Sequence, residues 1–241
     1  MRVDICIPAY NEAQILEEST KQIYNFCKKN FTNFDWQIVL VINGSNDNSP
    51  AIAKELEKKY PNVSAVIFKE GGRGQALKKY WLSSSAEIVS YMDSDLAVNL
   101  EALPRLLNPL INNQADLTIG NRYHKNSLVK RSFLRELSSR LYNLIAKILL
   151  HHKQPDLQCG FKAIKKEVFN KLSNKTNDVG WFFDTELIIW AEKLNFRVLG
   201  VSINWQETRL GKRSSKVKLF SATIKFLKLL WAFRKQLKTS I

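Results

Sequence analysis

Two carboxylates, Asp93 and Asp95, stand one residue apart directly after the apolar or small residues Val89–Met92. Such a run is typical of the end of a buried strand, and residues i and i+2 of an extended chain lie on the same side. Both carboxylates then point beyond the strand end. Hard oxygen ligands of this kind suit Mg²⁺ or Mn²⁺ and leave positions for water and phosphate oxygens. Asp-x-Asp is also common in turns and helix caps. The motif alone therefore does not establish a metal site, and the rest of the chain must be considered.

The elements before Asp93 alternate between strands and helices. Strands are expected over Val3–Pro8, Trp36–Ile42, Val63–Phe68 and Glu87–Met92, and helices over Glu12–Lys28, Pro50–Tyr60 and Gln75–Ser84. This order predicts an α/β fold with a Rossmann-like, mostly parallel sheet and helices on both faces. Ligands of such sheets gather at the carboxyl ends of the strands. We therefore expect one edge to carry the loops Pro8–Glu12, Asn43–Ser49, Gly71–Gly74 and Asp93–Asp95.

The second half of the chain is expected to complete the same domain, over residues 1–217. Its pattern predicts helices over Leu100–Ile111, Ser132–Leu150 and Trp181–Leu194, and strands over Asp116–Gly120 and Arg197–Trp205. Residues 218–241 are expected to form a basic amphipathic helix, an appendage and not a separate domain. Its aromatic and cationic residues fit an anionic membrane interface, although most amphipathic helices pack their apolar face on a core.

The net charge of +15 over 241 residues indicates a polyanionic partner, which means nucleic acid, an anionic membrane or a phosphorylated substrate. No apolar run reaches the length of a membrane span, and the N-terminus is not a secretory signal. The three cysteines are far apart, which argues against a disulfide framework or a zinc cluster. His124, His151 and His152 are expected on the surface, and Cys159 is expected as a small buried residue and not a nucleophile.

Eight short motifs, in order, resemble those of the family-2 glycosyltransferases and in particular the dolichyl-phosphate (polyprenyl-phosphate) mannosyl- and glucosyltransferases. Four follow the early strands: Pro8–Glu12, Gly44–Ser49, Arg73–Ala76 and Asp93–Asp95. The later four are Gly120–Tyr123, Gln158–Lys162, Phe183–Leu187 and Ser215-Lys216. The resemblance covers residues 3 to about 217 and implies the GT-A fold.

The resemblance also implies a site and its partners. Asp93 and Asp95 would hold Mg²⁺ or Mn²⁺ against the diphosphate of UDP-glucose or GDP-mannose. Arg122 and Lys216, helped by Arg209 or Arg213, would stabilise the charge on the leaving group. The usual Asp-Asp-Gly-Ser of the second loop is here Ile42-Asn43-Gly44-Ser45, which leaves the nucleotide base open. The donor site would comprise Pro8, Tyr10, Glu12, Ile42, Asn43, Gly44, Ser45, Arg73, Asp93, Ser94, Asp95, Arg122 and Arg209.

The acceptor decides whether a general base is needed. The resemblance implies direct attack with inversion at the anomeric carbon, and a polyprenyl phosphate is anionic already. A glycan or other hydroxyl acceptor would need a base, for which Asp184 is the candidate. Asp184 and Glu186 do not share a helix face, so we expect only one of them in the site. A further alternative is a homologue that binds the nucleotide-sugar but has lost the activity. Asn43, which departs from the usual motif of the second loop, is the one residue that indicates it.

A basic nucleic-acid-binding protein is the alternative from another class. It would account for the charge, but not for paired carboxylates, which repel phosphate without a metal, and the chain carries no zinc-finger or helix-turn-helix signal. We therefore expect no nucleic-acid partner. The expected location is cytoplasmic, peripheral on the inner face of the membrane, because the chain carries no segment that would cross one. A separate membrane protein is a further possible partner.

Overall fold

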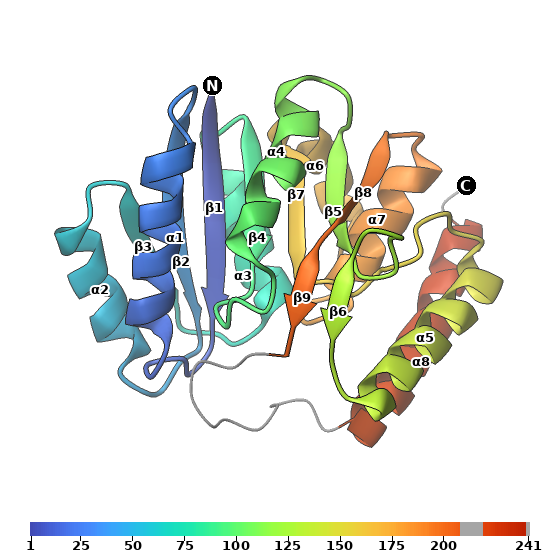
Figure 1. Ribbon diagram of the computed structural model, residues 1–241. Helices are drawn as coiled ribbons and strands as arrows, with labels where there is room; N and C mark the ends of the chain where they lie inside the picture. Colours follow the sequence, from blue (N-terminus) through green and yellow to red (C-terminus); the bar gives the residue numbers. More distant parts are fainter. Residues whose placement is uncertain (208–218, 240–241) are drawn as a thin grey trace.

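The computed structural model describes the backbone of residues 1–207 and 219–239, and the side chains of residues 1–207 and 225–238. A seven-stranded sheet in the order β3-β2-β1-β4-β7-β5-β8 forms its centre (Figure 1). All of its strands run in one direction except β7, which pairs antiparallel with both β4 and β5. The strands are β1 Arg2–Ala9, β2 Asp35–Asn43, β3 Val63–Phe68, β4 Ile88–Met92, β5 Leu117–Asn121, β7 Phe161–Lys165 and β8 Val198–Ser202. The predicted α/β fold with a mostly parallel sheet is confirmed.

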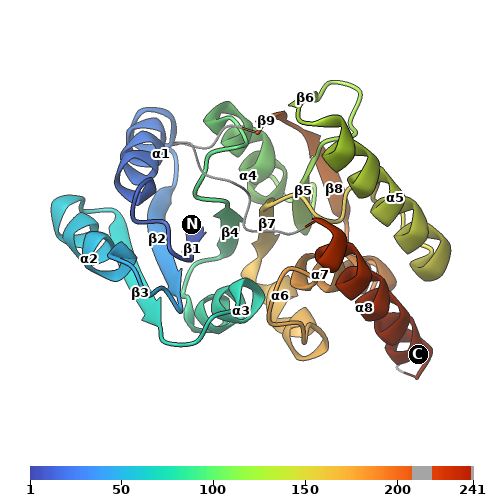
Figure 2. The ribbon, with the colours of Figure 1, turned by 90° about the horizontal axis from the view of Figure 1, so that it is seen from below.

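Helices cover both faces of this sheet, as the alternation of elements predicted. One core cluster joins the sheet to α1 (Leu16–Asn30), α2 (Ser49–Lys59) and α4 (Leu103–Ile111). A second cluster, on the other face, involves α3 (Arg73–Ser83), α6 (Lys166–Leu172) and α7 (Phe183–Lys193). Figure 2 shows these two layers on opposite sides of the strands. Two short 3₁₀ helices, η1 (Leu100–Ala102) and η2 (Ser173–Lys175), complete the connections.

Two long helices, α5 (Phe133–Leu150) and α8 (Leu219–Thr239), pack side by side beyond the β8 edge of the sheet (Figures 1 and 2). The described part of α8 buries Leu230, Phe233 and Leu237 in the second core cluster. The Phe233 ring centroid lies 5.7 Å from that of Phe182 and 6.0 Å from that of Trp190. The predicted domain boundary between residues 217 and 218 lies outside the described residues and stays a prediction.

The central strands are buried on both faces, which is why their sequence shows no polar alternation. Every residue of β1 from Val3 to Ala9 is buried, and β2 is buried from Ile38 to Asn43. β3 matches its predicted bounds, and the other strands of the first half shift by a residue or so. Burial that continues to the carboxyl ends of β1 and β2 therefore places the first two loops at that edge of the sheet.

Two predicted elements need correction. The first helix begins at Leu16, because the turn at Asn11 (φ 53°) and the Glu12 carbonyl, which accepts from Ile15 and Leu16, precede it. The expected strand Arg197–Trp205 is two strands: β8 pairs with β5, and β9 (Asn204–Gln206) pairs with β6 (Leu128–Lys130) in a separate small sheet. The break falls at buried Ile203, whose N–H donates to Ser127 Oγ at 3.0 Å.

The sequence interpretation missed β6 and α6, because a three-residue strand and a seven-residue helix are too short to give a clear periodicity. His152 is a further correction: it is buried with 5% exposure, whereas His151 is exposed and forms the left-handed C-cap of α5. Cys6, Cys27 and Cys159 are all free and buried. Burial raises the pKa of the Cys159 thiol to about 12, in keeping with the prediction that it is not a nucleophile.

Candidate active site

The first two loops are tied together by hydrogen bonds at the carboxyl ends of β1 and β2. The Asn11 N–H donates to Ser45 Oγ at 3.0 Å, and the Asn46 N–H donates to Asn11 Oδ1 at 2.8 Å. The Glu12 N–H donates to Ser49 Oγ at 2.9 Å, and Asp47 accepts from the Ala13 N–H. The two loops predicted to bind the donor nucleotide therefore form one connected surface.

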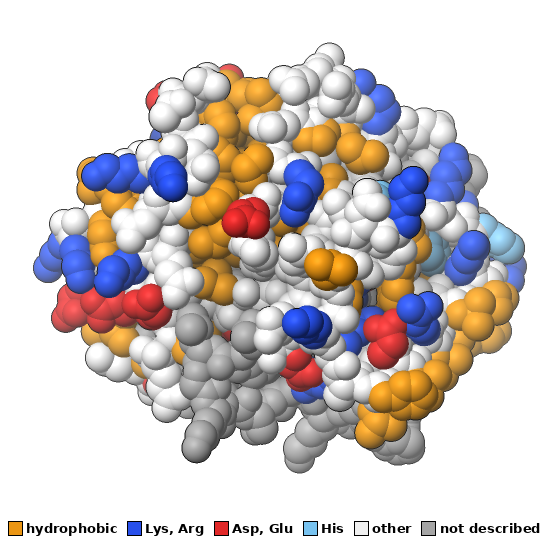
Figure 3. Space-filling model, viewed as in Figure 1, with side chains coloured by type: hydrophobic (Ala, Val, Ile, Leu, Met, Phe, Trp, Pro, Cys, Tyr) orange, Lys and Arg blue, Asp and Glu red, His pale blue; other side chains and the backbone are white. Residues whose placement is uncertain are grey.

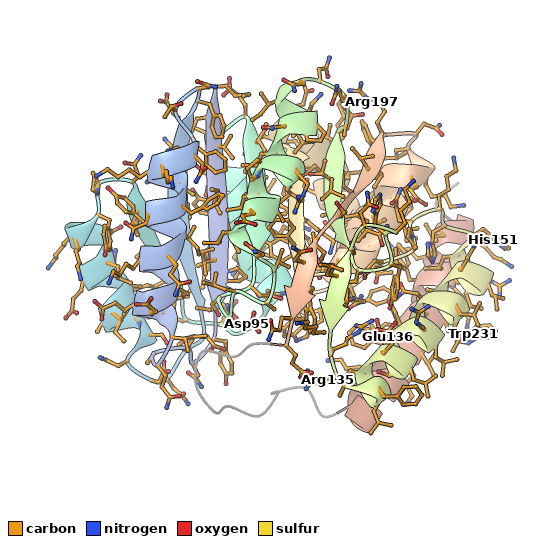
Figure 4. The ribbon with its side chains drawn as sticks, in the orientation of Figure 1. Asp95, Arg135, Glu136, His151, Arg197 and Trp231 are labelled. Carbon is orange, nitrogen blue, oxygen red and sulfur yellow. The ribbon has the colours of Figure 1, made fainter. Side chains whose placement is uncertain are left out.

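Gly44 brings the third loop against this surface. Its φ of 67° is in the left-handed region, and a Cβ there would lie 2.6 Å from the backbone nitrogen of Gly71. Only glycine permits this approach. The three loops and Asp93–Asp95 thus meet at one edge of the sheet, as expected from the strand order, and Figure 4 shows Asp95 at this edge.

Asn43 is buried and faces into the protein. Its Nδ2 donates to the carbonyl oxygen of Ala9 at 3.0 Å and to that of Val41 at 3.4 Å. A carboxylate has no proton with which to make either bond. Asn43 therefore joins the ends of β1 and β2. The amide that replaces the usual acid stabilises this edge through hydrogen bonds that an acid could not donate. Its neighbour Ile42 is fully buried.

Asp93 and Asp95 follow β4, as predicted. The Asp93 side chain is 37% exposed and its N–H donates to the Gly160 carbonyl at 3.2 Å, while Asp95 Oδ1 accepts from the Ala97 N–H at 3.1 Å. Burial raises the pKa of Asp93 to about 6, Arg73 opposes the rise, and the carboxylates of Asp95 and Asp184 add to it. A bound cation would reduce the repulsion among these neighbouring carboxylates.

The donor atoms suit a hard divalent ion. Within residues 1–207 and 225–238, no cluster of three or more acidic, His or Cys side chains could enclose a metal. Two carboxylates would leave most coordination positions open, as Mg²⁺ and Mn²⁺ sites that bind phosphates require. Asp93 and Asp95 therefore fit an open metal site, and Ser94 between them is buried.

Arg73, at the start of α3, connects Asp93 to the interior. Its side chain is 8% exposed, and its guanidinium lies 3.2 Å from Asp93 Oδ1 and pairs with Asp184. Its Cζ also lies 4.1 Å from the ring centroid of Trp181 and 5.2 Å from that of Tyr91. Arg73 was predicted to bind the nucleotide-sugar, and the structure shows it holding Asp93.

Asp184, at the start of α7, is fully buried. Its carboxylate pairs with Arg73 and with Lys162, whose Nζ lies 3.2 Å away, and accepts from the Tyr91 hydroxyl. Lys162 is itself fully buried. A general base must come within hydrogen-bond reach of the proton that it removes. In this arrangement Asp184 instead compensates two buried cations, which does not favour its predicted role as a base.

Glu186 belongs to a different contact, which agrees with the expectation that only one of the two acids lies near the site. Its Oε2 accepts from the N–H groups of Asn177 and Asp178 at 2.7 and 2.8 Å. Burial raises its pKa to about 7, although those two hydrogen bonds lower it. Glu186 therefore fixes the loop that leads to Trp181.

Arg122 does not present a free cation. Its Nε and Nη2 donate to the two oxygens of Asp156 at 2.7 and 2.8 Å, and its own N–H donates to Asp156 as well. The Arg122 side chain is 10% exposed and Asp156 is fully buried. The predicted electrostatic role of Arg122 at the diphosphate therefore finds no support in this geometry. The predicted cations Arg209, Arg213 and Lys216 lie outside the described residues.

The remaining predicted donor residues lie at the same edge or just beneath it. Pro8 is buried within β1, Tyr10 is 46% exposed and Glu12 is partly exposed. Sequence reasoning missed Tyr91 and Asp156 as parts of the site, and weighed Trp181 as a core aromatic although it is 48% exposed. Gly160 lay in the motif Gln158–Lys162, without a role assigned to it. Lys162 stood in a quoted motif, but nothing in the sequence indicated its pairing with Asp184.

Comparisons with known proteins identify the family of the chain. The sequence profile of Glycosyl transferase family 2 matches residues 4–173. Glycosyltransferase AglD of Haloferax volcanii is 28% identical over 207 residues, which cover 86% of this chain but only 33% of AglD. The dolichyl-phosphate beta-glucosyltransferase of Dictyostelium discoideum is 27% identical over 239 residues, covering 94% of this chain and 72% of that one. The human dolichyl-phosphate beta-glucosyltransferase is 26% identical and is covered over 68% of its length.

Solved structures show the same fold. Glucosyl-3-phosphoglycerate synthase from Mycobacterium tuberculosis, in complex with Mn²⁺, UDP and glucosyl-3-phosphoglycerate, aligns with a TM-score of 0.69 at 18% identity. The alignment covers 97% of this chain and 80% of that one. The sheet and its flanking helices thus have the GT-A fold. The chain belongs to glycosyltransferase family 2.

Proposed function

We propose that the protein transfers a hexose from a nucleotide-sugar, UDP-glucose or GDP-mannose, to a polyprenyl phosphate by direct attack with inversion. The observation that carries the proposal is the position of Asp93 and Asp95 at the carboxyl end of β4, with Arg73 3.2 Å from Asp93. The names of the relatives, which include dolichyl-phosphate beta-glucosyltransferases, support the acceptor class. Family membership supports the reaction type.

Asp95, together with Asp93, would hold Mg²⁺ or Mn²⁺. When bound, the ion supplies positive charge that stabilises the leaving diphosphate. The chain's own part is to fix the carboxylates. Arg73 holds Asp93 from one side, and Gly160 makes room for it on the other, since a Cβ there would lie 2.0 Å from Asp93 Oδ2. A preorganised arrangement of this kind costs little reorganisation when charge develops.

The burial of Asp184 favours an anionic acceptor over a hydroxyl. A phosphate attacks without losing a proton to the enzyme, so it needs no general base, whereas a hydroxyl does. Asp184 is fully buried and already compensates Arg73 and Lys162. Transfer to a glycan or other hydroxyl with Asp184 as the base would first require this cluster to open.

The proposal places the reaction at a membrane surface, because the acceptor is anchored in lipid while the donor is soluble. Within residues 1–207 and 219–239 no helix is both long and apolar enough to cross a bilayer. We propose peripheral attachment to the anionic cytoplasmic face, aided by a separate membrane protein where the cell supplies one. The net charge of +15 supports an anionic surface.

A panel of nucleotide-sugars tests the proposal. UDP-glucose or GDP-mannose should raise the unfolding midpoint in the presence of Mn²⁺, because a ligand that binds only the folded state stabilises it by mass action. The nucleotide-sugar that does so should then donate its hexose to a short-chain polyprenyl phosphate. Metal-dependent binding with transfer only to hydroxyl acceptors would refute the acceptor. No stabilisation by any nucleotide-sugar would refute the whole proposal.

A further inference from the structure

The outer side of α5 carries a stripe of exposed apolar residues. Its members are between 49% and 77% exposed: Phe133, Leu134, Leu137, Leu141, Leu144 and Ile148. At 3.6 residues per turn they fall within about 100° of arc. The opposite side of α5 buries Tyr142, Ala146 and Leu150 in the core. α5 therefore has two apolar sides, only one of which the described residues cover. Figure 3 shows the exposed stripe as a band along the lower right of the molecule.

Cations border the stripe on both helices. Arg140 is 65% exposed and Lys147 is exposed, while Lys228 and Lys235 of α8 are exposed beside Trp231, which is itself 55% exposed. Leu227, Lys228, Trp231, Ala232 and Lys235, all of α8, line a shallow hollow of about 500 Å³. Figure 4 labels Trp231 on this flank. An exposed indole beside lysines is typical of side chains at a membrane interface.

The positive charge of α5 and α8 favours an anionic lipid surface over a second copy of the chain as the partner. Their sequences contain Glu136 as the one acidic residue, and it already pairs with Arg131 and Arg140. The basic residues of the pair are Arg135, Arg140, Lys147, Lys225, Lys228, Arg234, Lys235 and Lys238. A second copy of the chain docked on this flank would bring two such sets of cations together, which is unfavourable. An anionic lipid surface offers both headgroup charge and apolar depth.

The stripe is also connected to the site edge. Tyr123 follows Arg122, and its hydroxyl lies 2.7 Å from Ser139 Oγ of α5 and 3.2 Å from Arg131 Nη2. At the start of α5, Arg135 Nη1 lies 2.5 Å from Glu207 Oε1. Figure 4 shows Arg135 toward the same lower edge of the molecule as Asp95. A surface that meets the N-terminal turns of α5 therefore lies close to the loops that follow the strands.

We propose that α5, flanked by Trp231 and the lysines of α8, is the surface by which the protein lies on an anionic phospholipid bilayer. The inference rests on the proposed function, because a membrane-binding surface would bring the active site to a lipid-anchored acceptor. The sequence expectation gave the membrane contact chiefly to the last helix, and the amphipathic pattern of Ser132–Leu150 is similar to it. Described residues of α8 instead bury Leu230, Phe233 and Leu237, so α5 offers the larger apolar face.

Sedimentation with vesicles tests this surface without donor or acceptor. The full chain should bind vesicles rich in phosphatidylglycerol and bind phosphatidylcholine vesicles weakly. The triple variant Leu137→Gln, Leu141→Gln, Leu144→Gln should lose about tenfold or more in vesicle affinity. The matched control Ile67→Gln, Leu82→Gln, Leu199→Gln removes side chains that are 42% to 47% exposed elsewhere, and should bind like the unmodified chain.

Equal vesicle binding by the α5 variant and the unmodified chain would overturn the proposal. So would sedimentation-velocity data in which the unmodified chain is a dimer and the α5 variant a monomer, since the stripe would then be an interface between copies. Transfer to a short-chain, water-soluble acceptor separates this test from the proposed function. The α5 variant should keep that transfer, whereas its absence in the unmodified chain would count against the reaction and not the surface.

Discussion

The guanidinium of Arg73 joins Asp93, 3.2 Å away at the edge of the sheet, to Asp184, which is fully buried. Asp93 and Asp184 are 91 residues apart in sequence, yet one side chain fixes both. Lys162 completes the balance of charge at 3.2 Å from Asp184. The carboxylate proposed to meet the nucleotide-sugar is thus held by a buried ion-pair cluster and not by its own loop alone.

Asp184→Asn removes the charge that compensates Arg73 and Lys162. Leaving a buried charge unpaired typically costs about 3–5 kcal/mol, and Asp93 remains as a partial partner, so we expect a loss of about 2–4 kcal/mol. The free energy of unfolding in urea measures it. Donor affinity should fall too, because Arg73 no longer holds Asp93 in place. Asp116→Asn, which removes a carboxylate far from the site, is the control and should leave donor affinity unchanged. Full stability in Asp184→Asn, with turnover lost, would instead support a general base.

Gly160→Ala tests the space around Asp93. The added Cβ would lie 2.0 Å from Asp93 Oδ2, so the carboxylate must leave its position beside Arg73. We expect weaker metal-dependent donor binding, by about tenfold or more, with the fold retained. Gly71→Ala is the matched control, because a Cβ there meets nothing within 4 Å. Isothermal titration with UDP-glucose and GDP-mannose compares the two. Equal donor affinity in both variants would show that Asp93 needs no such support.

Asn43→Asp tests whether the two hydrogen bonds donated by the Asn43 amide stabilise the fold. A carboxylate at this buried position would face the carbonyl oxygens of Ala9 and Val41, to which Asn43 now donates. We expect a loss of about 1–3 kcal/mol in the free energy of unfolding, the usual cost of an unsatisfied buried polar group. Asn46→Asp, in the exposed part of the same loop, should change stability little. A variant as stable as the unmodified chain would contradict the inward orientation of Asn43.

Asp116 should make stability depend on pH in a defined direction. Hydrogen bonds from Arg197 hold the pKa of Asp116 well below its usual range, against the opposing effect of partial burial, and Lys165 adds to them. Because the folded pKa is the lower one, the stabilisation is complete above the ordinary value of about 3.9 and is lost as pH falls below it. Asp116→Asn should therefore cost about 2 kcal/mol near neutral pH, and the difference should shrink in acid. A difference that stays constant between neutral pH and acid would contradict this assignment.

The sequence predicted the elements whose burial leaves a clear pattern. β1, β2 and β4 are apolar runs buried on both faces, and the loops after them carry recognisable motifs. Contacts between residues that are far apart in the sequence leave no such pattern in it. Arg73 and Asp184 are 111 residues apart, and Arg122 and Asp156 are 34 apart, so no local periodicity links them. Arg122, which was expected at the diphosphate, pairs with Asp156. Asp184, the candidate base for a hydroxyl acceptor, pairs with Arg73 and Lys162.

The second side of α5 shows a similar limit. The sequence predicts Ser132–Leu150 as an amphipathic helix, but it does not show which of the apolar residues enter the core and which stay exposed. Only the packing of Tyr142 and Ala146 against α7 and α8 separates the two sides. Conversely, the last helix was predicted to meet a membrane interface, with packing on the core as the alternative. Its described residues Leu230, Phe233 and Leu237 are in the core, and Trp231 is exposed.

The central claim is that Asp93 and Asp95 bind a divalent ion that holds the donor diphosphate. Isothermal titration of UDP-glucose and GDP-mannose, with and without Mn²⁺, tests it most directly in the unmodified chain and in Asp95→Ala. The account predicts Mn²⁺-dependent binding of one of these donors, its loss by about a hundredfold or more in Asp95→Ala, and an unchanged unfolding midpoint without ligand. Donor binding in Asp95→Ala that remains as tight and as dependent on Mn²⁺ as in the unmodified chain would contradict it.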